Sequence, residues 1–342
     1  MGTQTVAGDA VASRHWADAL ADLVLAGGEI DREAALCILR AADGDVPALL
    51  RATGRVRERH WGRRVKLCQL RNARSGLCPE DCHYCSQSAV SEADIPRYRL
   101  DAVDELLAAS RKAVAAGARR FCMVTSGRGP SRNDIERFAA AARRIKAEHP
   151  GLELCVSLGL MEEDQARALK TAGIDFVNHN LNTSASHHPN ICTTHTYADR
   201  LRTVENVRRA GLSTCSGGII GMGESDEDIV DLAFALRELR VDSLPVNFLH
   251  PIDGTPFAET RALTPMRCLR ALCLFRLTNP AAEIRMAGGS ELNLGWFRPL
   301  ALFAANSLFV DGYLTTPGQE YRAAHAMVED MGFVVEGSAA AP

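Results

Sequence analysis

The chain is poor in aromatic residues and in lysine, and it lacks any long apolar run. Only 6% of its 342 residues are aromatic, and its 39 basic residues include just four lysines. The formal net charge is -3, and no basic block or acidic tail indicates a polyanionic partner. The longest uncharged stretches are rich in Asn, Ser, Thr, His or Gly, whereas a membrane helix needs about twenty mostly apolar residues. We therefore expect no nucleic acid and no membrane among its partners.

Cysteine is present at a level that excludes a disulfide scaffold. Eleven cysteines are few for a chain of this length, and an odd number rules out complete pairing. Cysteines in reducing compartments more often serve metal or redox chemistry than disulfides. The first residues also lack the basic leader and apolar core of a targeting peptide. These features predict a cytoplasmic protein in which part of the cysteine binds metal.

Short apolar runs alternate with amphipathic stretches along most of the chain. The runs predict eight strands, at residues 65–70, 120–125, 152–158, 174–181, 212–220, 243–249, 283–286 and 307–310. Helical periodicity falls between or after them, at residues 134–149, 162–172, 197–210, 226–240, 265–278 and 319–331.

Eight strands alternating with helices over about 270 residues is the pattern of a (β/α)8 barrel of the TIM type. An open doubly wound sheet would give the same alternation and is the alternative. We predict the α/β barrel over residues 61–332, a helical N-terminal extension over residues 1–60 and a C-terminal tail over residues 333–342.

Three cysteines lie close together in a loop directly after the first predicted strand. Cys78, Cys82 and Cys85 have the spacing C-x3-C-x2-C. Three such thiolates can hold three irons of a four-iron, four-sulfur cluster and leave the fourth iron open to an outside ligand. The alternatives are a zinc site completed by His83 and a closed cluster completed by Cys68. In a barrel this loop lies at the carboxyl ends of the strands, where active sites are built.

Three further cysteines, Cys122, Cys155 and Cys215, occupy the middle of predicted strands. Each one alone is typical of core packing, because free cysteine is among the most buried residue types. Inward-pointing side chains of a barrel converge on its axis, however, so the three together suit a second metal centre. Arg285 lies at a similar depth, where an arginine would ordinarily be a buried ion-pair partner. The remaining cysteines, Cys192 among them, are predicted to be packing residues, and His187 and His188 a solvated turn.

Asparagines alternate along the fourth predicted strand. Asn178, Asn180 and Asn182 therefore share one face, and Asn247 in the sixth strand could join them from across the barrel. Amide groups suit a neutral polar ligand such as a urea or a ribose. A satisfied interior hydrogen-bond network is the alternative.

These motifs resemble those of the radical S-adenosylmethionine enzymes, which share C-x3-C-x-aromatic-C, and among them the biotin synthase family. The resemblance runs from about residue 61 to about residue 332. It is carried by GLCPEDCHYCSQS at 76–88, FCMVTSGRGP at 121–130, NHNLNTS at 178–184, TTHTY at 193–197 and CSGGIIGMGE at 215–224. The aromatic residue of the loop motif is Tyr84.

The resemblance implies an enzyme, a sulfurtransferase that converts dethiobiotin to biotin with a radical derived from S-adenosylmethionine. It implies a [4Fe-4S] cluster on Cys78, Cys82 and Cys85. It also implies a [2Fe-2S] cluster that donates sulfur and is held by Cys122, Cys155, Cys215 and Arg285. A small redox protein as electron donor and a homodimer are implied as partners.

The resemblance further implies the residues that bind the small molecules. Asn178, Asn180 and Asn247 would contact the ureido ring of dethiobiotin. Asn180 and Asn182 would contact the ribose of S-adenosylmethionine, and Arg200 its carboxylate.

Two positions depart from the family pattern. Many members have Asp or Glu where this chain has Asn182, which removes an anionic acceptor for the ribose. The family sequence AGGRE reads AGGSE here, so Ser290 replaces an arginine near the inner cluster. Two other functions remain open: a radical enzyme with a different substrate, such as a maturase or mutase, and a non-catalytic iron–sulfur carrier.

Overall fold

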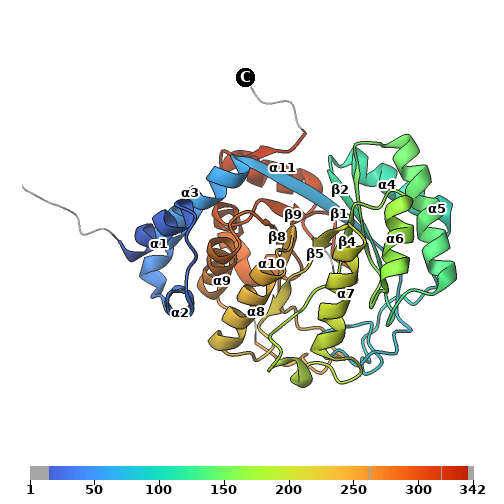
Figure 1. Ribbon diagram of the computed structural model, residues 1–342, viewed down its shortest axis with the longest axis horizontal. Helices are drawn as coiled ribbons and strands as arrows, with labels where there is room; N and C mark the ends of the chain where they lie inside the picture. Colours follow the sequence, from blue (N-terminus) through green and yellow to red (C-terminus); the bar gives the residue numbers. More distant parts are fainter. Residues whose placement is uncertain (1–14, 262, 317, 338–342) are drawn as a thin grey trace, which may run out of the picture.

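A closed parallel barrel forms the centre of the molecule (Figure 1). This computed structural model describes residues 15–261, 263–316 and 318–337. The barrel strands are β1 (Arg64–Arg74), β2 (Arg120–Thr125), β3 (Glu153–Ser157), β4 (Phe176–Asn178), β5 (Ser213–Cys215), β7 (Ser243–Phe248), β8 (Glu283–Met286) and β9 (Ser307–Phe309). Strand β9 pairs back onto β1, so the sheet closes and the alternative of an open sheet is wrong. The predicted (β/α)8 barrel is confirmed.

Helices surround the barrel between its strands (Figure 1). They are α4 (Val103–Ala115), α5 (Arg132–Glu148), α6 (Glu163–Thr171), α7 (Tyr197–Arg209), α8 (Asp226–Glu238), α9 (Pro265–Thr278), α10 (Ser290–Leu294) and α11 (Tyr321–Asp330). Short 3-10 segments are η1 (Asp43–Asp45), η2 (His188–Asn190) and η3 (Gly295–Phe303). Helices α5, α7, α8 and α9 begin at hydroxyl side chains that accept a backbone N–H three residues later, namely Ser131, Thr196, Ser225 and Thr264.

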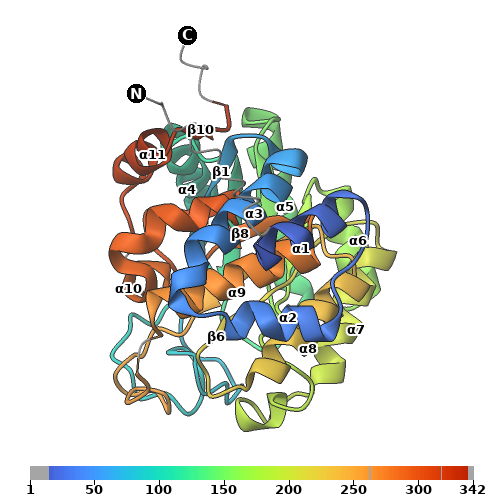
Figure 2. The same cartoon turned by 90° about the vertical axis from the view of Figure 1, so that its left-hand side faces the viewer.

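Three helices precede the barrel and pack against its outside (Figure 2). They are α1 (Trp16–Leu25), α2 (Arg32–Arg40) and α3 (Val46–Trp61), and they contact α8 and α9. Helix α2 starts at Asp31, whose carboxylate accepts the Ala34 N–H at 2.9 Å. The apolar side chains of these helices belong to the same core cluster as those of α9. Residues 1–14 of the predicted extension lie outside the described residues.

The described chain ends in a short strand instead of an irregular segment. Strand β10 (Val334–Val335) pairs with β1 on the outside of the barrel. Packing therefore continues beyond residue 332 into the segment predicted as a tail. Residues 338–342 of that segment lie outside the described part.

Strands β2 and β3 place large apolar side chains outward and their cysteines inward. On β2 and β3, Phe121, Met123 and Leu154 join a core cluster beneath the surrounding helices. The alternating residues Cys122 and Cys155 face the barrel interior instead. An interior filled by polar and sulfur-bearing side chains differs from the branched apolar layers usual in such barrels.

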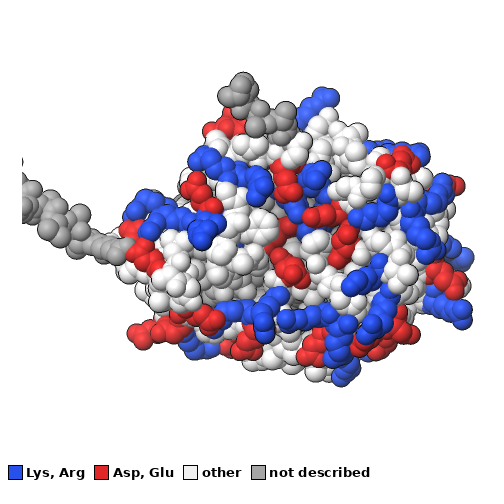
Figure 3. Space-filling view, turned by 45° about the horizontal axis from the view of Figure 1, so that its top comes forward, with Lys and Arg blue, Asp and Glu red and all other residues white. Residues whose placement is uncertain are grey.

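On the outer surface, acidic and basic residues are interspersed over the face in Figure 3. Within the described part of the chain, no helix combines the length and the apolarity needed to cross a bilayer.

The fifth barrel strand is interrupted between β5 and β6 (Gly218–Ile220), and both halves pair with β7. At the break, the Gly217 N–H donates to the Asn180 side chain at 3.2 Å and its carbonyl accepts the Asn182 N–H at 3.0 Å. The interruption therefore gives the asparagine segment its backbone partners.

Replacing Gly217 with alanine is expected to lower the free energy of unfolding by about 2–3 kcal/mol. A Cβ at this position would lie 1.9 Å from the Pro245 carbonyl oxygen, so β7 would have to move away. Urea unfolding followed by circular dichroism measures the change. Gly44→Ala is the matched control, because nothing lies within 4 Å of a Cβ there. Equal midpoints for the two variants would show that the contact carries no strain.

Candidate active site in the barrel cavity

A cavity opens at the carboxyl ends of the strands and reaches into the barrel. Every residue of the predicted sites lines it except Cys215, whose sulfur lies 3.3 Å from the Asn178 side chain that does. The loop cysteines and the strand cysteines thus belong to one enclosed site, with the asparagines beside both sets.

The loop after β1 carries Cys78, Cys82 and Cys85 on the cavity wall. Burial raises the pKa of Cys85 to about 11, and the backbone N–H groups of Gln87 and Ser88 oppose that rise. Burial also raises the pKa of Cys78, against backbone N–H groups of the kind that stabilise a thiolate. Three thiols, two of which accept backbone amide hydrogen bonds at sulfur, are a donor set that an iron–sulfur cluster uses.

The two alternatives for this loop receive no support from the geometry. Cys68, the candidate for a fourth cluster ligand, lies inside the barrel with its sulfur 3.4 Å from the Ser307 hydroxyl, and it does not line the cavity. His83, the candidate for a zinc ligand, packs edge-on against Phe257 with ring centroids 5.9 Å apart.

The strand cysteines converge inside the barrel. Cys122 and Cys155 are register partners on β2 and β3, and Cys215 on β5 is the partner of Asn178. The Cys155 thiol interacts with both of the other two, and all three are at most 4% exposed. The hydrogen bond from Cys155, together with Arg285, lowers the pKa of Cys215 to about 5. A cluster of thiols with one already inclined to ionise is suited to bind metal.

Arg285 faces this sulfur cluster from β8. Its Nη1 atom lies 3.7 Å from the Cys215 sulfur, and its Nε and Nη2 atoms donate to the hydroxyls of Ser307 and Ser243 at 3.1 and 3.0 Å. It also forms an ion pair with Glu283. The arginine is therefore a buried ion-pair partner, as its type suggests, and it directs one nitrogen toward the thiols.

Glu283 also forms ion pairs with two further cations, Arg120 and Lys66. Arg120 donates to it at 2.9 Å, and the Lys66 ammonium lies 3.3 Å away. Burial opposes its ionisation, but Arg120, Arg285 and Lys66 hold the pKa of Glu283 well below its usual range. A charged network centred on Glu283 thus lies behind Arg285, the member of the network that lines the cavity.

The asparagines are already hydrogen-bonded. The Asn178 side chain donates to the Asn180 side-chain oxygen at 3.0 Å. Asn247 donates to the Gly218 carbonyl and accepts the Gly288 N–H, both at 3.0 Å. The network alternative therefore holds in part, yet each amide retains unused hydrogen-bonding capacity that faces the cavity.

Asn182 and Arg200 meet at Tyr84. Asn182 has a left-handed backbone with φ of 72°, which asparagine tolerates, and its amide donates to the Tyr84 hydroxyl. Arg200 donates to the same hydroxyl at 3.3 Å and to the Asn180 carbonyl at 2.8 Å. Sequence reasoning noted Tyr84 only as part of the cysteine motif and missed this contact.

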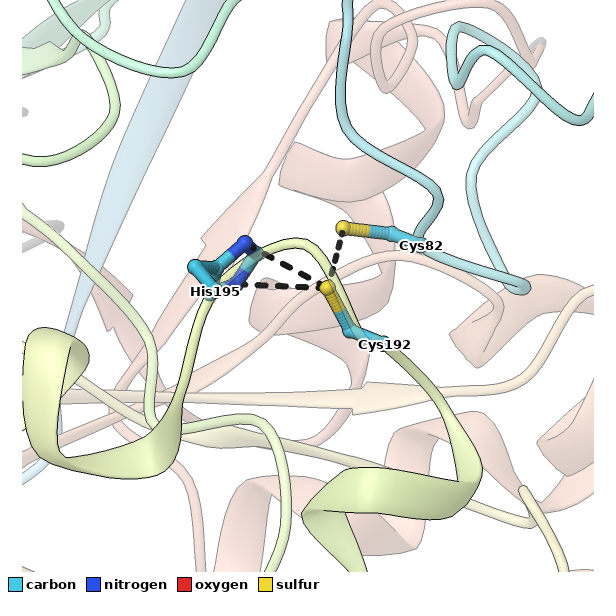
Figure 4. A group of neighbouring side chains, drawn as sticks. All are labelled: Cys82, Cys192 and His195. Carbon is cyan, nitrogen blue, oxygen red and sulfur yellow. Dashed lines mark hydrogen bonds between the residues drawn. The ribbon is translucent and has the colours of Figure 1, made fainter.

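Cys192 is buried in an apolar cluster, as predicted for a packing residue, and its sulfur also lies 3.7 Å from that of Cys82 and contacts the His195 ring (Figure 4). One sequence prediction near the loop is wrong. His187 and His188 are buried instead of solvated, and His188 accepts the Arg200 Nε–H at 3.3 Å. The contact between Cys82 and Cys192 joins segments 110 residues apart, so no local pattern could reveal it.

Ser290, the second departure from the family pattern, begins α10. Its hydroxyl donates to the Glu291 carboxylate at 3.1 Å, and the residue does not line the cavity. The serine is buried, and within the described part of the chain its hydroxyl makes no hydrogen bond to the strand cysteines.

Comparisons with known proteins agree with this geometry. The Radical SAM superfamily matches residues 74–236, and the Biotin and Thiamin Synthesis associated domain matches residues 245–334. Biotin synthase from Rhodopirellula baltica is 52% identical over 321 residues, which cover 94% of this chain and 89% of that protein. The chain belongs to the biotin synthase family. Biotin synthase from Bacillus subtilis is 50% identical over 317 residues, which cover 93% of this chain and 94% of that protein.

Membership of the biotin synthase family makes the chain an enzyme of the sulfurtransferase class. Among solved structures, methylornithine synthase superposes with a TM-score of 0.81 at 20% identity, covering 92% of this chain and 97% of that one. The hydrogenase maturase HydG superposes with a TM-score of 0.78 at 14% identity, covering 95% of this chain and 76% of that one. At these identities the two structures establish the shared fold alone.

Glu283→Gln is expected to lower the free energy of unfolding by about 3–5 kcal/mol at neutral pH, since it leaves buried cations without their anion. The pKa of Glu283 is lowered on folding, so its contribution is complete above the ordinary value of 4.5 and is lost as the pH falls through the folded value. Urea unfolding at a series of pH values should show the gap between parent and variant closing in acid.

The matched control is Glu153→Gln, which removes a carboxylate that contacts the same Lys66 and Arg120 but is one-third exposed. We expect a smaller loss for this control. An equal loss for both variants would contradict a special role of Glu283.

Proposed function

We propose that this enzyme converts dethiobiotin to biotin. The proposal rests on one observation above all: two separate thiol sets line or adjoin a single cavity, with amide side chains beside them. The outer set of Cys78, Cys82 and Cys85 would hold a [4Fe-4S] cluster, and the inner set of Cys122, Cys155, Cys215 and Arg285 a [2Fe-2S] cluster. When bound, S-adenosylmethionine and the outer cluster supply a carbon-centred radical, and the inner cluster supplies sulfur.

The outer end of the cavity suits S-adenosylmethionine. Arg200 is buried and held by the Asn180 carbonyl and by Tyr84, which orients its guanidinium for a carboxylate. Asn180 and Asn182 lie beside it and offer amide groups to the hydroxyls of a ribose. The contact from Asn182 to Tyr84 supports this role, because it fixes the side chain next to the cysteine loop.

The middle of the cavity suits dethiobiotin. Asn178, Asn180 and Asn247 present amide donors and acceptors that match the carbonyl and N–H groups of a ureido ring. Apolar side chains lie on the same walls and would enclose the aliphatic part of the substrate: Leu70, Val124, Ile219 and Phe309. Such walls exclude water, and a reactive radical requires this exclusion.

The inner end suits a sulfur-donating cluster. The thiols of Cys122, Cys155 and Cys215 interact with one another, so they lie close enough together to bind neighbouring metal ions. Arg285 would contribute its Nη1 atom, the nitrogen that faces Cys215. Its other nitrogens stay bonded to Ser307 and Ser243, which hold the guanidinium plane in place.

A radical enzyme with another substrate is the second candidate, because the fold is shared with a methylornithine synthase and a maturase. The inner set of three cysteines and an arginine favours sulfur insertion over these functions. A small redox protein as electron donor, a homodimer and a cytoplasmic location complete the proposal, and family membership supports them.

Removing an inner cysteine should separate the two halves of the reaction. In anaerobic assays of reconstituted protein with dethiobiotin, S-adenosylmethionine and a reductant, Cys215→Ala is expected to form 5'-deoxyadenosine but no biotin. Cys78→Ala is expected to form neither product, and the exposed Cys37→Ala should match the parent. Mass spectrometry follows both products.

For the parent, deoxyadenosine without biotin would point to a different substrate. Neither product, in protein shown to contain iron and sulfide, would favour a non-catalytic carrier. Loss of deoxyadenosine in Cys215→Ala, with its four-iron absorbance intact, would contradict the division of labour between the two thiol sets.

Asn182→Asp should strengthen the binding of S-adenosylmethionine. A carboxylate accepts a hydrogen bond about twice as strongly as an amide does, so we expect the KM for S-adenosylmethionine to fall about three- to tenfold with kcat little changed. Deoxyadenosine formation at varied cofactor concentration measures this. Asn182→Ala should move the KM in the opposite direction, and an unchanged KM in both variants would remove Asn182 from the cofactor site.

A further inference from the structure

Cys82 also belongs to a second group of side chains with metal-binding atoms. Among the described residues, the ligand atoms of Cys82, Cys192 and His195 all lie within 4.8 Å of one another (Figure 4). Cys82 belongs to the loop after β1, whereas Cys192 and His195 belong to the segment between β4 and α7. All three side chains are buried.

The spacing of these atoms matches one tetrahedral metal ion. Two sulfur ligands at about 2.3 Å from a tetrahedral ion lie about 3.8 Å apart, and a sulfur and an imidazole nitrogen about 3.5 Å apart. The Cys82 and Cys192 sulfurs are 3.7 Å apart, and the Cys192 sulfur lies 3.3 and 3.6 Å from the two ring nitrogens of His195. These edges match a tetrahedral ion, and the remaining edge, between the Cys82 sulfur and the His195 ring nitrogen, is within 4.8 Å and would close on binding.

The carboxylate partner of His195 is also of the kind found behind metal-bound histidines. Its Nδ1 atom is paired with the Glu80 carboxylate, which leaves Nε2 for a second partner. A carboxylate behind a histidine fixes the ring and raises its basicity at many zinc sites. Glu80 is itself held by Arg128 at 3.0 Å and by the Thr194 hydroxyl at 2.7 Å.

The fourth position of such an ion would be open to water. The Asp81 carboxylate is close to the site, with Oδ1 3.1 Å from the Cys192 sulfur. That oxygen already accepts the backbone N–H groups of Thr193 and Thr194 at 2.9 and 3.2 Å. Asp81 therefore fixes the loop that carries Cys192 and is not needed as a ligand.

We propose that Cys82, Cys192 and His195 form a site for one thiophilic divalent cation, with Zn²⁺ as its representative, and that this ion and the four-iron cluster exclude each other. The exclusion rests on the proposed function, because it assigns Cys82 to the cluster. Binding of the cation itself depends only on the three side chains.

Cobalt binding to the full-length, cluster-free, reduced chain tests the site. Co²⁺ gives thiolate charge-transfer bands and tetrahedral visible bands, and Zn²⁺ should abolish both by displacement. We expect Cys192→Ser and His195→Ala each to lower the affinity for Co²⁺, measured from these bands, at least about tenfold. Cys78→Ser, Cys85→Ser and the exposed Cys37→Ser should leave it unchanged.

The opposite pattern would overturn the proposal. If Cys78→Ser and Cys85→Ser abolish cobalt binding while Cys192→Ser does not, the ion uses the cluster cysteines alone. Cys192→Ala serves as a second variant, and circular dichroism confirms that each variant is folded. Cobalt bands that are identical in the parent and in both Cys192 variants would also overturn it.

The exclusion has a separate readout. Chain preloaded with Zn²⁺ should take up iron and sulfide into its four-iron cluster several times more slowly than metal-free chain, and Cys192→Ser should remove the delay. Absorbance and iron content measure the uptake. A delay that persists in Cys192→Ser overturns the exclusion, and absence of cluster from metal-free parent would instead count against the proposed function.

Discussion

The ionised carboxylate of Glu283 is the interaction on which the inner half of the cavity depends. It contacts Arg120, Arg285 and Lys66; Arg120 and Lys66 also contact Glu153, whereas Glu283 is the carboxylate that pairs with Arg285. Glu283 and Arg285 lie two residues apart on β8, so both point inward and the guanidinium turns toward Cys215. The charged network around Glu283 thus positions the Arg285 guanidinium next to the Cys215 thiol. The same positive charge, after the hydrogen bond from Cys155, helps to lower the pKa of Cys215.

With this arrangement, apolar packing is reduced inside the barrel and is concentrated between the strands and the surrounding helices. Most such barrels fill their interior with branched apolar residues, whereas here cysteine and asparagine line an open cavity. The loss is offset by two large apolar clusters between the strands and the helices, one of which includes the N-terminal helices. The helical extension therefore contributes to the stability of the barrel. A hollow interior and a well-packed exterior come from the same alternation of side chains along each strand.

Sequence patterns predicted those parts of the fold that depend on local periodicity. The apolar runs located all eight barrel strands, because burial on the outer face requires such residues. Strand β10 escaped prediction because two residues cannot establish a period, and so did the break at Gly217. The alternation of asparagines gave the right cavity wall, although β4 ends at Asn178 and Asn182 bends back with a left-handed backbone.

The site itself was predictable only where its residues are close in sequence or lie at equal depth in strands. Their spacing indicates that Cys78, Cys82 and Cys85 form one site. Their register indicates the same for the strand cysteines. No such pattern indicates Cys192, because it lies 110 residues from Cys82 and meets it only through the fold. His188 likewise reads as part of a polar turn until Arg200 is found against it.

The contacts between the loops after β1 and β4 make the environment of Cys82 a property of the barrel face. Asp81 accepts hydrogen bonds from Thr193 and Thr194, and the His83 N–H donates to the Ile191 carbonyl at 3.0 Å. These bonds tie the two loops together on both sides of Cys82, so the distance to Cys192 does not depend on the cysteine side chains alone. The Cys82 thiol is thereby held near two proposed sets of ligands, the other loop cysteines on one hand and Cys192 with His195 on the other. A substitution in the loop after β4 can change which partner that thiol prefers without altering the C-x3-C-x2-C motif.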